Sequence, residues 1–310
     1  MRSVILVISF QAAVIACILS YAGGMFAPVY SVLLIVGLVS AHTASNLTND
    51  YFGYTRNYDT LESPRRRYTI HPLASGVLSR LQVKILVAFF LAVGLSIALF
   101  FTYLHGIGVL AFVLAGIILM VSYDATPVTL KQLGLGEMAA FIVWGPLMIE
   151  GGFYALTGQL SLMAFLVSIP YGLGVMSILL GKHLDQMAFD RSKKQNTLPV
   201  ILGTDRAKLL SSALIIFMYL LVLVFVALRE ITAFALLVFI NLPRAVRAVN
   251  VFLSPKPKVP PKGYVGWPLW YHRYGLFNNR NFGWLFIIGL LTGAALGHFG
   301  YSFLLCICAR

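Results

Sequence analysis

Two clusters of acidic and amide side chains are the part of this sequence best suited to chemistry. The first occupies residues 46–59 and the second occupies residues 182–191. Mg²⁺ prefers oxygen ligands and completes its octahedron with phosphate oxygens and water, so two such clusters brought together would bind magnesium on a diphosphate. The candidate metal ligands, each a carboxylate or an amide, are Asn49, Asp50, Asp185 and Asp190.

Helical spacing places Asn46, Asn49 and Asp50 on one stripe at the end of an apolar segment. A simpler interpretation is that both clusters are polar helix ends that meet water. Carboxylates are mildly unfavourable at the negative end of a helix dipole, which favours a functional role for these clusters.

Between the clusters, residues 122–137 form a loop that contains proline and glycine, with Lys131 as its single cation. This lysine either marks the side of the membrane or contacts a phosphate group.

The elements that must position these clusters are membrane helices. Of the 310 residues, 59% are hydrophobic and 11% are charged, against about 45–50% and 25% in soluble domains. This composition excludes an ordinary soluble globule and a disordered chain, and three cysteines are too few for a disulfide framework. We therefore predict an integral membrane protein built as one helical domain over residues 1–310.

Nine apolar segments are long enough to cross a bilayer, which predicts an all-α polytopic fold. The predicted spans are residues 3–22, 29–49, 83–104, 106–123, 138–156, 161–182, 208–228, 231–251 and 283–306.

The basic residues are distributed unevenly between the two sides of this predicted membrane domain. The chain has 23 Lys and Arg residues against 10 Asp and Glu, and 21 of the 23 fall on one side of the membrane. The positive-inside rule makes that side, with the N-terminus and the long loops, cytoplasmic. Membrane topology thus accounts for the basic charge, and we predict membrane lipid rather than nucleic acid as a partner.

Three cytoplasmic connections are long, at residues 50–82, 183–207 and 244–282, and loops of that length usually carry function. We therefore expect the chemistry on the cytoplasmic side. Prolines and lysines over 254–263, followed by Trp267 and Trp270, are typical of a strap that lies at the lipid headgroups. A lid over a cavity is the alternative for the same segment.

Five ordered segments resemble one known family. They are residues 44–52, 71–76, 130–137, 144–148 and 197–203. In this order, on nine spans, the sequence is similar to the UbiA-type intramembrane aromatic prenyltransferases, and most of all to the branch that acts on dihydroxynaphthoate in menaquinone synthesis. The resemblance covers residues 1–205 well and the final third only by helix pattern. It implies a bundle of nine helices around a cavity that is open to lipid.

The resemblance also implies roles for individual residues. In that family the acids of the first motif hold magnesium on a prenyl diphosphate, and here Asn49 and Asp50 match that motif. Gly53 stands where the next Asp is expected, Asn57 replaces the last acid, and Asp59 lies where the menaquinone branch often carries one.

The second motif matches through its two acids and the Thr-Leu-Pro-Val run at 197–200. The resemblance makes Asp185 and Asp190 metal ligands. A basic residue commonly precedes the Pro-Leu-x-Ser-Gly run; here that residue is His71, and the arginines at 65–67 are nearby alternatives.

The expected function is Mg²⁺-dependent transfer of a prenyl chain from a prenyl diphosphate to a small aromatic or quinone-precursor acceptor. The expected catalytic residues are Asp50, Asp185 and Asp190, and the expected diphosphate-binding residues are Asn46, Asn49, Arg56, Arg67 and Lys131. Two alternatives remain open. A membrane terpene cyclase of the same superfamily would ionise the diphosphate without an acceptor, and a lipid-binding or transport protein would use the fold without catalysis.

Overall fold

The computed structural model describes residues 2–60 and 63–298, and the regular structure of that part is helical throughout. Its helices are α1 (Arg2–Ala22), α2 (Pro28–Thr55), η1 (Pro64–Arg67), α3 (Arg80–His105), α4 (Ile107–Asp124), α5 (Gly136–Ile142), η2 (Val143–Leu147), α6 (Met148–Thr157), α7 (Leu162–Ser192), α8 (Leu198–Leu202), α9 (Thr204–Ala227), η3 (Ala233–Asn241), α10 (Leu242–Leu253) and α11 (Tyr271–His298).

Nine helices of the described chain are long and apolar enough to cross a membrane, which confirms the predicted fold class. The fifth crossing is composite, because α5 continues through the π-helix η2 into α6. Pro146 lies inside η2 and has no N–H to donate, so the regular α-helical hydrogen bonding is interrupted there. The eighth crossing combines the 3-10 helix η3 with α10, and Pro243 lies in the first turn of α10.

Three membrane helices extend by six residues or more beyond their predicted ends. α2 continues to Thr55 and α7 to Ser192, so both acid clusters begin inside helices. The last helix begins at Tyr271 and not at residue 283, and the final predicted residues, 299–306, lie outside the described residues. The predicted start was wrong because hydropathy counts polar residues against a span, although these side chains are buried or face a cavity inside the bundle: His272, Arg273, Asn278, Asn279 and Arg280.

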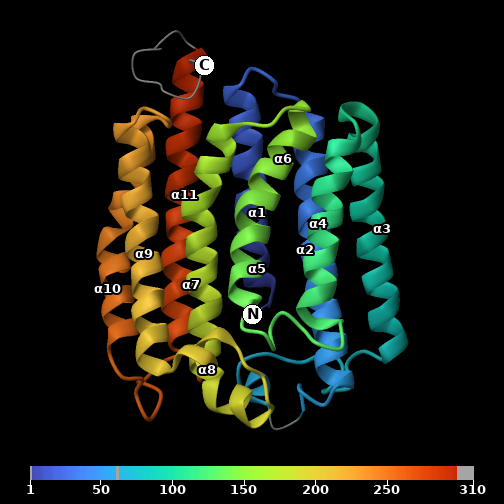
Figure 1. Cartoon of the computed structure of the whole chain (residues 1–310), viewed down its shortest axis with the longest axis vertical. Helices are drawn as coiled ribbons and strands as arrows, with labels where there is room; N and C mark the ends of the chain where they lie inside the picture. The colour runs from blue at the N-terminus through green and yellow to red at the C-terminus, as the bar shows by residue number, and fades with distance from the viewer. Residues whose placement is uncertain (1, 61–62, 299–310) are drawn as a thin grey trace.

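Most of the helices pack around one core, and α3 and α4 form a pair at one side of it (Figure 1). α1 contacts α2, α6 and α11, and α7 contacts α9 and α11, so these elements surround most of the core. α3 and α4 pack on each other and on α2; only Val83, Phe101 and Val109 among their apolar side chains are buried, and many of the others are exposed. In a bilayer these exposed side chains would meet lipid.

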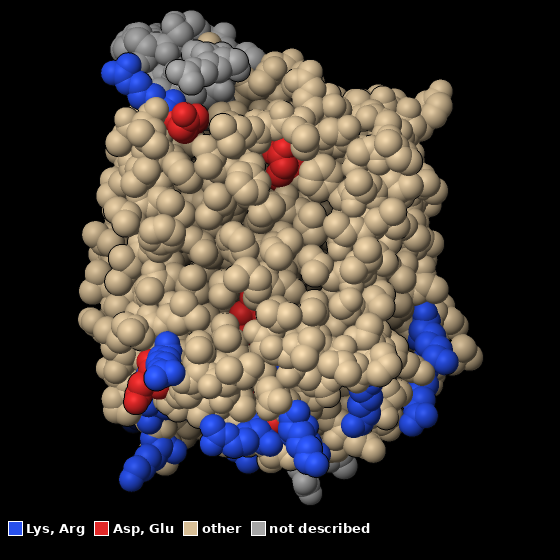
Figure 2. Space-filling model, in the orientation of Figure 1, with Lys and Arg blue, Asp and Glu red and all other residues tan. Residues whose placement is uncertain are grey.

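The long connections gather at one end of the bundle. Residues 56–60, 63–79, 125–135, 193–197 and 254–270 lie at the lower end in Figure 1, which we call the loop end. The connections at the opposite end are short. On the face shown in Figure 2, most Lys and Arg side chains also lie at the loop end, and the middle of that face is almost free of charge. This arrangement places the predicted site at one membrane surface.

Candidate active site

A buried group of opposite charges lies at the loop end of α2. Asp50, 3% exposed, forms an ion pair with the guanidinium of Arg65 in η1. The same Arg65 Nη1 lies 3.2 Å from Oδ2 of Asp59, and Nε2 of His71 lies 3.3 Å from that oxygen. All four side chains are buried. We call Asp50, Asp59, Arg65 and His71 the charge cluster.

Gly53 leaves the space that Asp59 occupies. A Cβ atom at position 53 would lie 3.1 Å from Cγ of Asp59 and would collide with its carboxylate. The carbonyl of Gly53 accepts the N–H groups of Tyr58 and Asp59 at 2.9 and 2.8 Å, which folds the chain back onto α2. Asn57 adopts the left-handed φ of 57° that this reversal requires, a conformation that asparagine tolerates. Asp59 thus supplies a carboxylate beside the position where the first motif lacks one.

The charge cluster keeps Asp59 ionised. Burial raises the pKa of the Asp59 carboxyl, but the hydrogen bond from His71 and the positive charges of Arg65 and Lys131 outweigh it. The net effect holds this pKa well below the ordinary value of 3.8. Burial conversely lowers the pKa of Arg65, and the adjacent carboxylates of Asp50 and Asp59 raise it above its ordinary value. Asp59 and Arg65 are therefore both charged at neutral pH.

The loop between α4 and α5 is fastened to the end of α2. Lys131 Nζ lies 3.5 Å from Oδ1 of Asp124 and 4.3 Å from the centroid of the Tyr58 ring. The amide of Asn49 donates a hydrogen bond to the carboxylate of Asp124. Arg56, which is exposed, donates to the carbonyls of Asp124 and Ala125 at 2.7 and 2.9 Å. The structure therefore brings Lys131 and Asn49 together, while Arg56 binds the backbone of this loop.

Asp190 of α7 reaches the same region through Tyr58. The hydroxyl of Tyr58 donates to Oδ1 of Asp190, and the hydroxyl of Thr197 donates to Oδ2 at 3.2 Å. Burial and the negative charge of Asp190 raise the pKa of Tyr58 far above its ordinary value, so this hydroxyl stays protonated. Gln186, one turn earlier on α7, donates to the hydroxyl of Tyr68 at 2.8 Å. These bonds join the loop end of α7 to the connection after α2.

Asp185 lies on another face of α7. It accepts hydrogen bonds from Nζ of Lys256 at 2.9 Å and from the backbone N–H of His272 at 3.0 Å. The prediction grouped Asp185 with Asp190, but five residues correspond to about 140° around a helix, so these side chains diverge. Gln186, four residues before Asp190, shares its face instead. The spacing itself was the signal that sequence reasoning overlooked.

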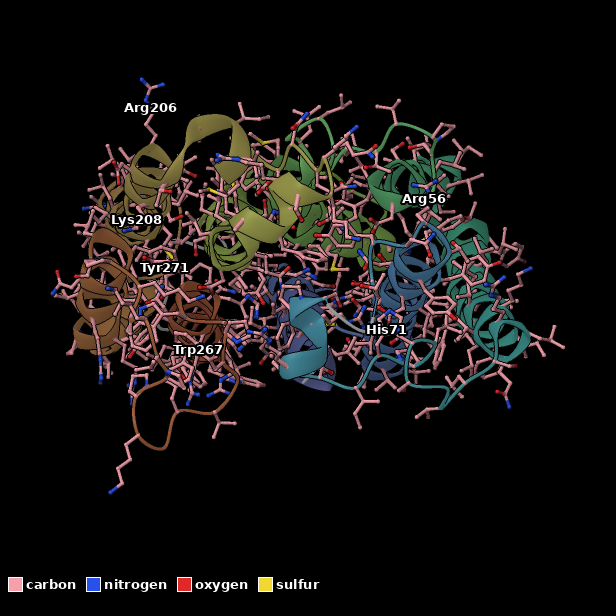
Figure 3. The ribbon with its side chains drawn as sticks, turned by 90° about the horizontal axis from the view of Figure 1, so that it is seen from below. Arg56, His71, Arg206, Lys208, Trp267 and Tyr271 are labelled. Carbon is pink, nitrogen blue, oxygen red and sulfur yellow. The ribbon has the colours of Figure 1, made fainter. Side chains whose placement is uncertain are left out.

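The remaining predicted residues divide between the cavity and the surface. Asn46 lines the main cavity, whereas Arg67 is exposed in η1. Arg65, two residues earlier, is the buried arginine that binds the carboxylates. The predicted site residues did not include Arg65 or Asp59, although the resemblance pointed to an acid at Asp59 and to the arginines at 65–67 as alternatives. An arginine run and a loop acid carry no periodicity that shows which side chain turns inward. Figure 3 views the loop end and shows His71 near its middle and Arg56 toward α3 and α4.

A cavity of about 600 Å³ lies within the bundle next to these groups. Apolar side chains from α1 to α7 and from α11 form most of its wall. Five polar side chains near the loop end also line it: Asn46, Asn49, Arg65, Tyr68 and Lys182. The site therefore combines a polar, charged end with an apolar volume, which suits a substrate that has an anionic head and a hydrocarbon chain.

Comparison with known proteins identifies the family. The model of the UbiA prenyltransferase family matches residues 10–269. The UbiA prenyltransferase domain-containing protein 1 of Dictyostelium discoideum is 26% identical over 227 residues, which are 72% of this chain and 68% of that protein. The 1,4-dihydroxy-2-naphthoate octaprenyltransferase of Bacillus subtilis is 25% identical over 221 residues, covering 68% of this chain and 67% of the relative.

Solved structures agree on the fold. A UbiA homologue from Aeropyrum pernix K1 superposes with a TM-score of 0.62 at 20% identity, covering 91% of this chain and 97% of that one. A UbiA homologue from Archaeoglobus fulgidus bound to GPP and Mg²⁺ gives a TM-score of 0.53 at 13% identity, covering 93% and 99%. The chain therefore belongs to the UbiA prenyltransferase family and is a membrane-embedded prenyltransferase.

The donor atoms at the loop end fit a magnesium ion. One ligand atom from each of Asp50, Asp59 and His71 lies within 4.8 Å of the others, and the two carboxylates offer the oxygen ligands that Mg²⁺ prefers. Asp190 of α7 is not one of these three residues; the hydroxyl of Tyr58 binds its carboxylate. Asp185 is directed to Lys256 and α11, so we do not include it in this donor set.

Proposed function

We propose that this protein transfers a prenyl chain from a prenyl diphosphate to an aromatic or quinone-precursor acceptor and that it requires magnesium. One observation carries the proposal: the polar ends of α2 and α7 meet beside an apolar cavity of about 600 Å³ in a UbiA-family chain. The naphthoate octaprenyltransferase among its relatives and the homologue bound to GPP and Mg²⁺ support it.

The residues at the loop end would bind and polarise the diphosphate. Lys131 and the amide of Asn49 offer donors from two elements that the structure holds together through Asp124. Magnesium held by Asp50, Asp59 and Asp190 would supply positive charge to the leaving diphosphate and so ease cleavage of the allylic carbon–oxygen bond.

The cavity wall would then control the fate of the allylic cation. Aromatic side chains that line the cavity stabilise positive charge through their ring faces, and the apolar lining excludes water that would otherwise capture the cation. The diphosphate leaves with the electron pair of the broken bond, a ring carbon of the acceptor bonds to the allylic carbon, and the ring then loses a proton. The aromatic residues available for this role are Phe90, Phe101, Phe112, Tyr123 and Trp144.

Product analysis tests the proposal. Purified protein would be incubated with magnesium and prenyl diphosphates of several lengths, with and without 1,4-dihydroxy-2-naphthoate or 4-hydroxybenzoate. We expect a prenylated ring that requires both an acceptor and magnesium. A terpene formed without an acceptor would point to a cyclase, and the absence of any product with every combination would contradict the proposal.

A matched pair of variants locates the chemistry. Lys131→Gln should lower the rate by about 100-fold, because it removes a charge from the diphosphate end. Arg206→Gln is the control, since Arg206 is exposed at the same loop end and points away from the bundle in Figure 3. It should retain the wild-type rate. Equal rates for both variants would place the diphosphate elsewhere.

A further inference from the structure

Two arginines of α10 lie where a membrane helix normally exposes apolar side chains. Arg244 and Arg247 are both exposed, and they belong to the eighth crossing, over Ala233–Leu253. Ionisable side chains within a membrane span are costly, and they usually face the interior of the bundle or a water-filled cavity. Neither arginine lines the main cavity. These two charges therefore require a partner on the outer surface of the bundle.

The two arginines form part of a polar stripe along α10. This helix lies at the edge of the bundle, where it packs on α9 and α11 (Figure 1). Its inner face buries Ala245 and Phe252. Arg244, Arg247 and Asn250 are spaced by three residues and are all exposed, so they follow one another along the outer side of the helix toward the loop end.

Arg247 points toward the membrane surface at the loop end. Its guanidinium lies 5.6 Å from the ring centroid of Tyr274, in the first turn of α11. The ring of Tyr274 packs on Trp270, with 5.1 Å between the ring centroids. Tyrosine and tryptophan are enriched at the level of the lipid headgroups, so this contact places the Arg247 guanidinium near that level.

The protein supplies neither guanidinium with a negative charge. Within residues 2–60 and 63–298, Arg244 and Arg247 have no carboxylate partner and no hydrogen-bond acceptor. A second copy of the chain does not supply one either. Among the acids that the structure describes, Asp205 alone is exposed, and it lies in the first turn of α9 at the loop end rather than at the depth of Arg244.

The surface around the two arginines is apolar. Leu242, Val246 and Leu253 of α10 are 42%, 50% and 54% exposed. Arg244 lies nine residues before Leu253, about 13.5 Å along a helix, which is within the roughly 15 Å half-thickness of a bilayer core. A long arginine side chain can extend its charged end along such a surface toward the headgroups. Two cations beside exposed aliphatic side chains suit a molecule that has an anionic head and hydrocarbon chains.

We propose that Arg244 and Arg247 bind the phosphate of an anionic phospholipid in the leaflet at the loop end, with its acyl chains along Leu242 and Val246. A guanidinium binds phosphate oxygens through two parallel hydrogen bonds, and basic residues at a membrane surface attract anionic lipids. This lipid site lies on the outer surface of α10, apart from the cavity and from the groups near Asp50.

Thermal unfolding with matched lipids tests the site. Purified, delipidated protein in a neutral detergent would receive phosphatidylglycerol or phosphatidylcholine with identical acyl chains. Phosphatidylglycerol should raise the Tm of the wild-type protein by roughly 3–5 °C more than phosphatidylcholine does, and the double variant Arg244→Gln/Arg247→Gln should lose that difference. Glycerol phosphate, which offers a phosphate without acyl chains, should leave the Tm unchanged. A Tm rise from glycerol phosphate equal to that from the anionic lipid would contradict a lipid site.

A matched control removes the same charge elsewhere at the loop end. Lys194 and Arg206 are both exposed there, and Arg206 points away from the bundle in Figure 3. Lys194→Gln/Arg206→Gln should keep the full preference for phosphatidylglycerol. Loss of the preference in this control would assign it to general surface charge, and equal Tm rises from the two lipids in the wild-type protein would overturn the proposal.

Native mass spectrometry gives a second measurement that does not depend on the stability of the variants. The wild-type protein should retain phosphatidylglycerol in preference to phosphatidylcholine. Arg244→Gln alone, which leaves the Arg247–Tyr274 contact in place, should retain less of it. A mass of two chains that is seen with the wild type and lost in the double variant would identify a second copy as the occupant and overturn the lipid site. Neither measurement uses a prenyl substrate, so both outcomes are independent of the proposed function.

Discussion

At the scale of single residues, the charge cluster shows how buried carboxylates are accommodated. Asp50 and Asp59 share one guanidinium from Arg65, and His71 binds the second of them. Removing one partner of a buried ion pair leaves an uncompensated charge, which is far more costly than removing the whole pair. Arg65 should therefore govern both the stability of the loop end and its response to pH.

Arg65→Gln should lower the Tm by roughly 5–10 °C at pH 7, measured in EDTA. The depressed pKa of Asp59 stabilises the wild-type fold above its ordinary value of 3.8, and this contribution is lost only as pH falls through the lower folded pKa. Without Arg65 this pKa should lie closer to its ordinary value, because one of the charges that lower it is lost while His71 and Lys131 remain, so the variant lacks part of this stabilisation.

The difference in Tm between wild type and Arg65→Gln should accordingly be constant near neutral pH and shrink as pH is lowered below the ordinary pKa of 3.8. Arg67→Gln, at an exposed position of the same η1 helix, should show no difference at any pH. A difference that stays constant with pH would show that Arg65 stabilises the loop end by packing rather than by charge.

At the scale of elements, α7 presents two acids to two different environments. Asp190 faces the connection after α2, where Tyr58 and Thr197 bind it. Asp185 faces α11 and the 254–270 segment, where Lys256 and the backbone of His272 bind it. That segment also lines the cavity through Val265, Gly266 and Leu269, so it has the position of a partial cover. Figure 3 shows its Trp267 on the same side of the loop end as Tyr271 and Lys208.

The two acids should respond unequally to the same substitution. Asp190→Asn should lower prenyl transfer by about 100-fold or more and raise the magnesium concentration needed for half-maximal rate. Asp185→Asn should reduce the rate less than tenfold and should lower the Tm, since Lys256 loses its ion pair. Rate measurements across a magnesium titration distinguish the two. Equal losses with equal shifts in magnesium requirement would return Asp185 to the metal site.

At the scale of the whole molecule, the distribution of charge and of long connections defines two unlike ends (Figures 1 and 2). We propose that the loop end faces the cytoplasm, on the positive-inside rule. The predicted diphosphate site lies at this end, so a water-soluble acceptor and the charged head of the donor would enter from the cytoplasm, while the prenyl chain would remain among apolar side chains or lipid.

Cysteine labelling tests this orientation. In a variant whose native cysteines are replaced by serine, Lys262→Cys at the exposed loop end should react with a membrane-impermeant maleimide only after cells are opened. Gln159→Cys, exposed in the short connection before α7 at the other end, should react in intact cells. The reverse pattern would place the active site outside the cytoplasm.

The sequence by itself determined the fold class and the number of membrane helices found in the described residues, and it predicted the segments of the candidate site. These features follow from local properties of the sequence. A stretch of about 20 apolar residues crosses a bilayer as a helix, because its backbone groups must be hydrogen-bonded internally, and polar residues at the ends of such stretches can be identified directly from the sequence. It also supplied Asn49, Asp50, Lys131 and Asp190, which the structure connects through Asp124, Arg65 and Tyr58.

Only the tertiary structure decided which charged side chains face one another. It placed Arg65 rather than Arg67 between the carboxylates, turned Asp185 toward α11 and exposed Arg280 to the cavity. It also began the last helix at Tyr271, because neighbouring helices and the cavity accept polar residues that hydropathy rejects. Pairing of buried charges depends on contacts between distant segments, and the properties of adjacent residues do not encode those contacts.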